Sequence, residues 1–189
     1  MSTPFFNFTL SYPGNLQEPS FLDLTVSNNS LFPPGTVLDA WCLDKSINFG
    51  TDTAYTGYVY SAYEPPTIGS ILPNLSAAVD RLDSVNWLLN YYNGSDVRYN
   101  WGEVQSAIWS LMGQDYRTEL GYTQEGGVVL DADVTSLVNQ ALAHDGYRPG
   151  LGESIAMIVD PVDAYGMATA TTSWCCWMTT ATANSQAPS

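Results

Sequence analysis

Apolar and β-branched residues gather in short runs along the first part of the chain, and turn-forming residues separate these runs. Pro13-Gly14 and Asn28-Asn29 are two of the separators, and such pairs are typical of turns between strands. The pattern predicts strands over residues 5–10, 21–26, 36–43 and 57–60. Residues 1–68 are therefore expected to form most of a β lobe.

After Pro73 the apolar residues recur at the spacing of a helix. Asn74 is expected to cap this helix, because its side-chain oxygen can accept hydrogen bonds from free backbone amides. The apolar stripe of the helix consists of Leu75, Val79, Leu82, Val85 and Leu89. The change of period predicts a helical part of the chain.

Two more helices follow from the same spacing. Residues 101–112 carry an apolar stripe, and Gln105 lies beside that stripe, so its side chain is expected to face packed protein. A third helix is expected to open at Asp131, whose carboxylate can cap free amides, and to end at His144 near Gly146. His144 would then lie at the negative end of the helix dipole.

The last β-rich runs, at residues 154–159 and 167–174, predict a hairpin that returns to the first lobe. We therefore expect an α+β fold in one domain, residues 1–178. Its β lobe, a sandwich or barrel-like structure, would comprise residues 1–68 and 146–178. An inserted helical lobe of roughly three helices would comprise residues 69–145, and residues 179–189 would form a flexible tail.

Composition places the chain among folded globular proteins, since 45% of its 189 residues are hydrophobic and 13% are charged. The net charge of −14 repels phosphate backbones and anionic lipids, which argues against nucleic-acid binding. Two interpretations of this negative charge are open: it keeps the protein soluble, or it attracts partners that carry amines. No apolar run is long enough to span a bilayer, and insertion into a membrane is not expected.

Cys42, Cys175 and Cys176 are the three cysteines, and they cannot all pair within the chain. One of them stands in Trp41-Cys42-Leu43-Asp44, at the end of a predicted strand. A second notable segment, Val104-Gln105-Ser106-Ala107-Ile108-Trp109, lies on a predicted helix. Together the two segments resemble the paired signatures of the thioester domains of bacterial surface adhesins. Trp41 departs from the family, which more often has Tyr, Phe or Leu before the cysteine.

This resemblance implies an internal thioester, which the Cys42 thiolate would form by attacking the side-chain carbonyl of Gln105 and expelling ammonia. Such a bond needs protection from water. Apolar neighbours are expected to supply it, with Trp109 as a shield one helical turn from Gln105 and with Trp41, Leu43 and Ile108 as further walls of the site. The chemistry needs no metal and no cofactor.

The expected function is covalent attachment rather than turnover. An amine, such as a lysine of a host or neighbouring-cell protein, would attack Gln105 and leave an isopeptide bond, so each molecule would react once. Lys45 is the only lysine in the chain, so few amines of its own would compete. The resemblance further implies a monomeric adhesin domain at the cell surface or in a secreted protein.

Other interpretations remain open from the residues alone. Cys42 could be a small buried hydrophobe and Gln105 a polar residue at the edge of a helix. A cysteine hydrolase or acyltransferase could use Cys42 as nucleophile, His144 for proton transfer and Asp160 to orient it. A lone histidine at a helix end is more often structural, and this interpretation of His144 stays open. The twelve tyrosines and six tryptophans could instead serve a non-covalent binding module.

Overall fold

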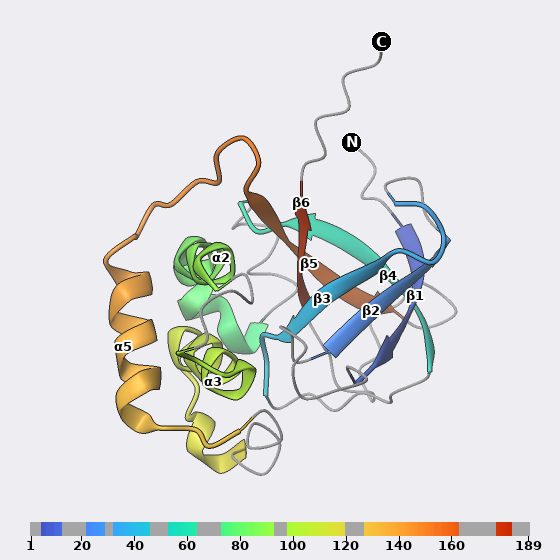
Figure 1. Cartoon of the computed structure of the whole chain (residues 1–189). Helices are drawn as coiled ribbons and strands as arrows, with labels where there is room; N and C mark the ends of the chain where they lie inside the picture. Colours follow the sequence, from blue (N-terminus) through green and yellow to red (C-terminus); the bar gives the residue numbers. More distant parts are fainter. Residues whose placement is uncertain are drawn as a thin grey trace.

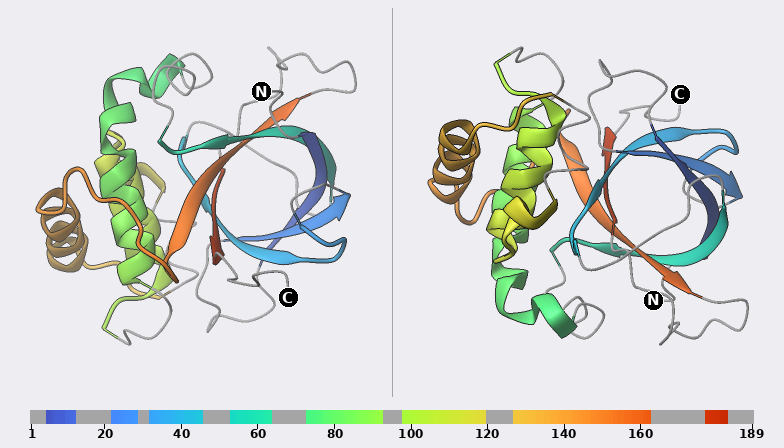
Figure 2. Two further views of the ribbon diagram at one scale, coloured as in Figure 1. Left: turned by 90° about the horizontal axis from the view of Figure 1, so that it is seen from above. Right: turned by 90° about the horizontal axis from the view of Figure 1, so that it is seen from below.

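The computed structural model describes residues 5–12, 22–28, 32–45, 53–63, 73–92, 98–119, 127–162 and 177–182. Its strands pair only in antiparallel fashion and close into a ring in the order β1-β2-β3-β6-β5-β4. Figure 2 views this ring along its axis. The strands are β1 (Phe5–Ser11), β2 (Leu22–Asn28), β3 (Val37–Cys42), β4 (Ala54–Ser61), β5 (Ser154–Val162) and β6 (Trp177–Thr182).

The described helices all lie between β4 and β5 in the chain and cover one side of the ring (Figures 1 and 2). They are the 3-10 helix η1 (Pro73–Arg81), α2 (Leu82–Tyr91), α3 (Trp101–Leu111), the 3-10 helix η2 (Tyr116–Glu119) and α5 (Asp131–Leu142). Helices α2 and α3 lie between the strands and α5, which packs on both of them (Figure 1). No helix in the described ranges is long and apolar enough to cross a bilayer.

One hydrophobic core joins the ring to the helices. Phe8 pairs with Val26, and Leu10 pairs with Leu24, so alternate residues of neighbouring strands share a buried face. Helix α3 is buried on every side from Trp101 to Trp109. A helix covered all round holds its polar side chains among packed protein, and this is the environment of Gln105.

The expected α+β class, with antiparallel strands and a group of helices, is confirmed. One helix departs from expectation in its first half, because residues 73–81 form the 3-10 helix η1 before α2 begins at Leu82. The period of apolar residues does not separate these two helix types well, since residues three apart share a face in both.

The end of the chain also differs from expectation. The strand predicted at residues 167–174 lies outside the described residues, as do Cys175 and Cys176. Strand β6 runs from Trp177 to Thr182 and so includes residues 179–182, which were expected to belong to a tail. Hydrogen bonding to β3 and β5 on its two sides stabilises this strand without any apolar period.

Asp131 does not cap α5, contrary to expectation, because the N-cap position is Leu130, whose side chain makes no capping hydrogen bond. Its carboxylate accepts hydrogen bonds from Tyr116 Oη and from the Arg117 guanidinium instead. These bonds lower the pKa of Asp131, and burial together with the Asp131 bond raises the pKa of Tyr116 to about 12. Asp131 therefore ties α5 to η2.

Candidate functional site

Cys42 and Gln105 lie in direct contact, although they are far apart in the sequence. The backbone N–H of Cys42 donates to Oε1 of Gln105 at 2.9 Å, and Nε2 of Gln105 donates to the carbonyl oxygen of Cys42 at 2.8 Å. The orientation of the carboxamide is determined by these partners, because an N–H requires an acceptor and a carbonyl requires a donor. Gln105 is 0% exposed and Cys42 is 2% exposed.

Helix α3 is fixed at its N-terminus by a capping box. The Asn100 side chain accepts from the Glu103 backbone N–H, and the Glu103 carboxylate accepts from the Asn100 backbone N–H. Glu103 Oε1 also accepts from the backbone N–H of Leu130, at the start of α5. Burial raises the pKa of Glu103, while these two backbone bonds lower it. The cap holds the start of α3 four residues before Gln105.

The other end of α3 closes in a Schellman motif. Gly113 has a φ of +76°, a conformation that L side chains rarely adopt, and its N–H bonds to the Ser110 carbonyl at 3.0 Å. The N–H of Gln114 then bonds to the Trp109 carbonyl at 2.8 Å. Gln114 therefore leaves the helix in a defined direction.

Gln114 contacts the segment that follows Cys42. Its Nε2 donates to the Leu43 carbonyl at 2.6 Å, and its Oε1 accepts from the Lys45 N–H at 2.8 Å. The Cys42 thiol donates to the Asp44 carbonyl within this segment at 3.2 Å. Sequence reasoning missed Gln114, and its position directly after a glycine at a helix end was the only available signal.

The expected wall residues are all buried. Trp41, Leu43, Ile108 and Trp109 are each no more than 3% exposed and belong to the same core. Trp41 contacts Tyr92 edge to face, with ring centroids 6.2 Å apart. Their burial fits the predicted role of keeping water from the pair, and the free cysteine Cys42 is enclosed with them.

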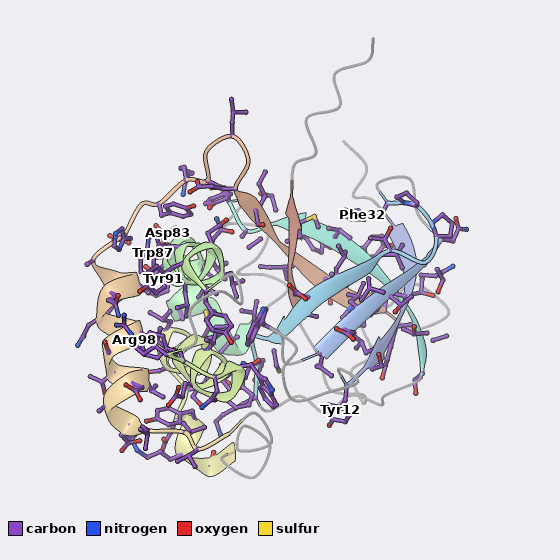
Figure 3. All side chains as sticks on the ribbon, viewed as in Figure 1. Tyr12, Phe32, Asp83, Trp87, Tyr91 and Arg98 are labelled. Carbon is purple, nitrogen blue, oxygen red and sulfur yellow. The ribbon has the colours of Figure 1, made fainter. Side chains whose placement is uncertain are left out.

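His144 lies elsewhere. It follows α5, is exposed, and stacks on Trp87 of α2 with ring centroids 4.1 Å apart. Its Nδ1 lies 2.8 Å from the Gln140 carbonyl, and Figure 3 shows Trp87 on the side of α2 that faces α5. Cys42, at the end of β3, contacts Gln105 of α3 and the Asp44 carbonyl instead, and no contact in the described residues joins it to His144.

Asp160 is buried in β5, opposite Tyr58 of β4, and is 4% exposed. Burial raises its pKa from 3.8 to about 6. Its Oδ1 has no hydrogen-bond partner among the residues described. No contact there joins Asp160 to His144, so a Cys42–His144–Asp160 triad has no geometric support in the described part of the chain.

Among the residues that the structure describes, no group of three or more His, Cys, Asp or Glu side chains could hold a metal ion. No family model matches the chain, and neither a curated protein nor a solved structure matches it.

Proposed function

We propose that the chain forms an internal thioester between Cys42 Sγ and the side-chain carbonyl carbon of Gln105, and uses it to bond covalently to an amine on a partner. The observation that carries this proposal is the pair of hydrogen bonds that holds the Gln105 carboxamide against the Cys42 backbone. A buried cysteine and a buried primary amide are thereby kept together.

The hydrogen bonds suit acyl transfer. When Sγ attacks the Gln105 carbonyl carbon, negative charge develops on Oε1, which already accepts the Cys42 N–H. A preorganised backbone N–H at that oxygen stabilises the tetrahedral intermediate. The C–N bond then breaks, the thiol proton and the –NH₂ group leave together as ammonia, and the C–S bond remains.

The second step consumes the thioester. A deprotonated primary amine attacks the same carbonyl carbon, the C–S bond breaks, and Cys42 Sγ takes up the proton that the amine loses. The product is an amide between Gln105 and the partner, so each molecule reacts once and no catalyst is regenerated. No metal and no cofactor takes part in either step.

The environment supports a long-lived thioester. Trp41 and Leu43 flank Cys42 in the sequence, and Ile108 and Trp109 follow Gln105 within about one helical turn. All four are buried in the core, and exclusion of water slows hydrolysis. Lys45 is the only lysine in the chain, and its Nζ donates to Thr118 Oγ1 at 2.6 Å. The one lysine amine of the protein is thus engaged in a contact of its own.

We further infer, from the resemblance to adhesin thioester domains, that the protein acts as a monomer at a cell surface or in a secreted form. Its β lobe would be interrupted by a helical lobe over residues 69–145. A lysine of a host or neighbouring-cell protein is the proposed partner. The net charge of −14 favours encounter with a lysine-rich surface.

Intact mass tests the proposal. The wild type is expected to weigh one ammonia less than its sequence requires, and methylamine is expected to add its full mass to that form. Cys42→Ala and Gln105→Ala should show the full sequence mass and no reaction. A wild type of full mass that methylamine leaves unchanged would exclude the thioester.

A further inference from the structure

A second carboxamide, that of Gln114, holds the segment after Cys42. It contacts both peptide groups that flank Asp44, through the Leu43 carbonyl at 2.6 Å and the Lys45 N–H at 2.8 Å. The two bonds use the acceptor and one donor of the Gln114 side chain. The backbone at Asp44 is thereby fixed to the end of α3.

One of these peptide groups also contacts the thiol. The Lys45 N–H and the Asp44 carbonyl belong to the same planar peptide unit. Gln114 holds the N–H side of that unit, and the Cys42 thiol donates to its C=O side at 3.2 Å. The orientation of this peptide unit therefore selects the rotamer in which the Cys42 thiol is held.

Both glutamines are carried by one rigid body. Gln105 lies within α3, and Gln114 follows the Schellman motif that ends it, with its own N–H bonded to the Trp109 carbonyl. The electrophilic carbonyl of Gln105 and the group that positions the thiol are therefore set relative to each other by the same helix. A shift of the segment after Cys42 would change the distance and angle of attack.

We propose that Gln114 is a positioning residue for thioester formation, which acts by orienting the Asp44–Lys45 peptide unit so that the Cys42 thiol is held for attack on Gln105. This inference rests on the proposed function. Gln114 itself contacts neither reacting atom in the proposed step, and its effect passes through the Asp44 carbonyl.

The experiment follows the loss of one ammonia by intact mass in freshly synthesised full-length chain, for the wild type, Gln114→Ala and Gln114→Glu. Gln114→Ala is expected to lose ammonia about tenfold or more slowly, because misplacing reacting groups costs rate steeply. Gln114→Glu keeps an acceptor for the Lys45 N–H and is expected to recover part of the rate. Gln140→Ala is the matched control, since the bonds of its carboxamide to described residues stay within α5 or go to Tyr99.

Thermal unfolding of each variant separates positioning from folding. If Gln114 served stability alone, each variant would lose ammonia more slowly only in proportion to its folded fraction. The rate of Gln114→Glu would then depend on the stability of that variant and not on the acceptor that it retains. A folded Gln114→Ala that loses ammonia at the wild-type rate overturns the inference. If that variant does not fold, Gln114→Leu, which also lacks both hydrogen bonds, takes its place, and a folded Gln114→Leu at the Gln140→Ala rate overturns the inference too. A wild type that never loses ammonia overturns the proposed function itself.

Discussion

At the scale of single residues, Gln105 substitutes for a neighbouring strand. The N–H and C=O of an extended residue point to the same side, where an adjacent strand normally bonds to both. The described part of β2 begins at Leu22, which pairs with Ala40, and within this part no residue of β2 pairs with Cys42. The Gln105 carboxamide offers a donor and an acceptor side by side and satisfies both groups of Cys42. A structural duty and the proposed chemical one thus fall on the same side chain.

This double duty predicts different stabilities for two variants that both lack the thioester. Cys42→Ala keeps both hydrogen bonds, because they go to the backbone. Gln105→Ala leaves a buried N–H and a buried C=O unpaired, each at a cost of about 1–3 kcal/mol. In urea unfolding, Gln105→Ala is expected to be less stable than Cys42→Ala by about 2 kcal/mol or more. Equal stabilities would mean that the carboxamide adds nothing to the fold.

Asp160 predicts a pH effect on stability. Burial raises its folded-state pKa from 3.8 to about 6. Between these values the unfolded chain releases the proton and the folded protein retains it, so the Asp160 contribution falls as pH rises through this window. Asp160→Asn cannot ionise, and its stability relative to the wild type is expected to be greater at pH 7 than at pH 4.

Urea unfolding at the two pH values measures this difference. Asp145→Asn, at an exposed position after α5, serves as the control and is expected to show a much smaller change. A stability difference between Asp160→Asn and the wild type that is the same at both pH values would contradict the assignment of a raised pKa to Asp160.

At the scale of elements, the accuracy of the sequence predictions depended on how local the determining interactions were. Helix α3 was expected over residues 101–112 and spans Trp101–Leu111, because its apolar stripe lies within the helix and its caps are directly next to it in the sequence. Its capping box of Asn100 and Glu103 was not among the predictions and emerged from the structure. Strand β6 was not predicted, because its pairing with β3 and β5 decides it, and the bonds of Asp131 to η2 replaced the predicted cap for the same reason.

The glycine that ends α3 gives an element-scale prediction. A Cβ added at Gly113 would meet nothing within 4 Å, so only its φ of +76° opposes a side chain. Gly113→Ala is therefore expected to cost about 1–2 kcal/mol in urea unfolding. Gly113→Asn should cost less, because asparagine tolerates this conformation better. If the two variants proved equally destabilised, a cause other than backbone conformation would be required.

At the scale of the whole molecule, the site lies where the ring of strands meets the helices. Cys42 ends β3, which pairs with β2 on one side and with β6 on the other. Gln105 belongs to α3, which packs against β3. Only the family resemblance predicted that the two residues would meet, because apolar periods carry no information on which distant segments pair. Closure of the ring by β3 and β6 was unpredictable for the same reason.

A thioester at this junction would cross-link the two parts of the fold, and this predicts a large effect on stability. The bond would join residues 63 positions apart. By analogy with disulfides, a link that closes a loop of that length lowers the entropy of the unfolded chain and so stabilises the fold by about 4 kcal/mol. Methylamine opens the thioester and leaves every other covalent bond intact. The treated wild type is therefore expected to melt roughly 10 °C lower than the untreated protein.

Cys42→Ala, which has no thioester, should melt at one temperature with or without methylamine. If the wild type reacts with methylamine but keeps its melting temperature, the thioester forms without supporting the fold, and packing of α3 against β3 in the shared core is enough to hold the two elements together.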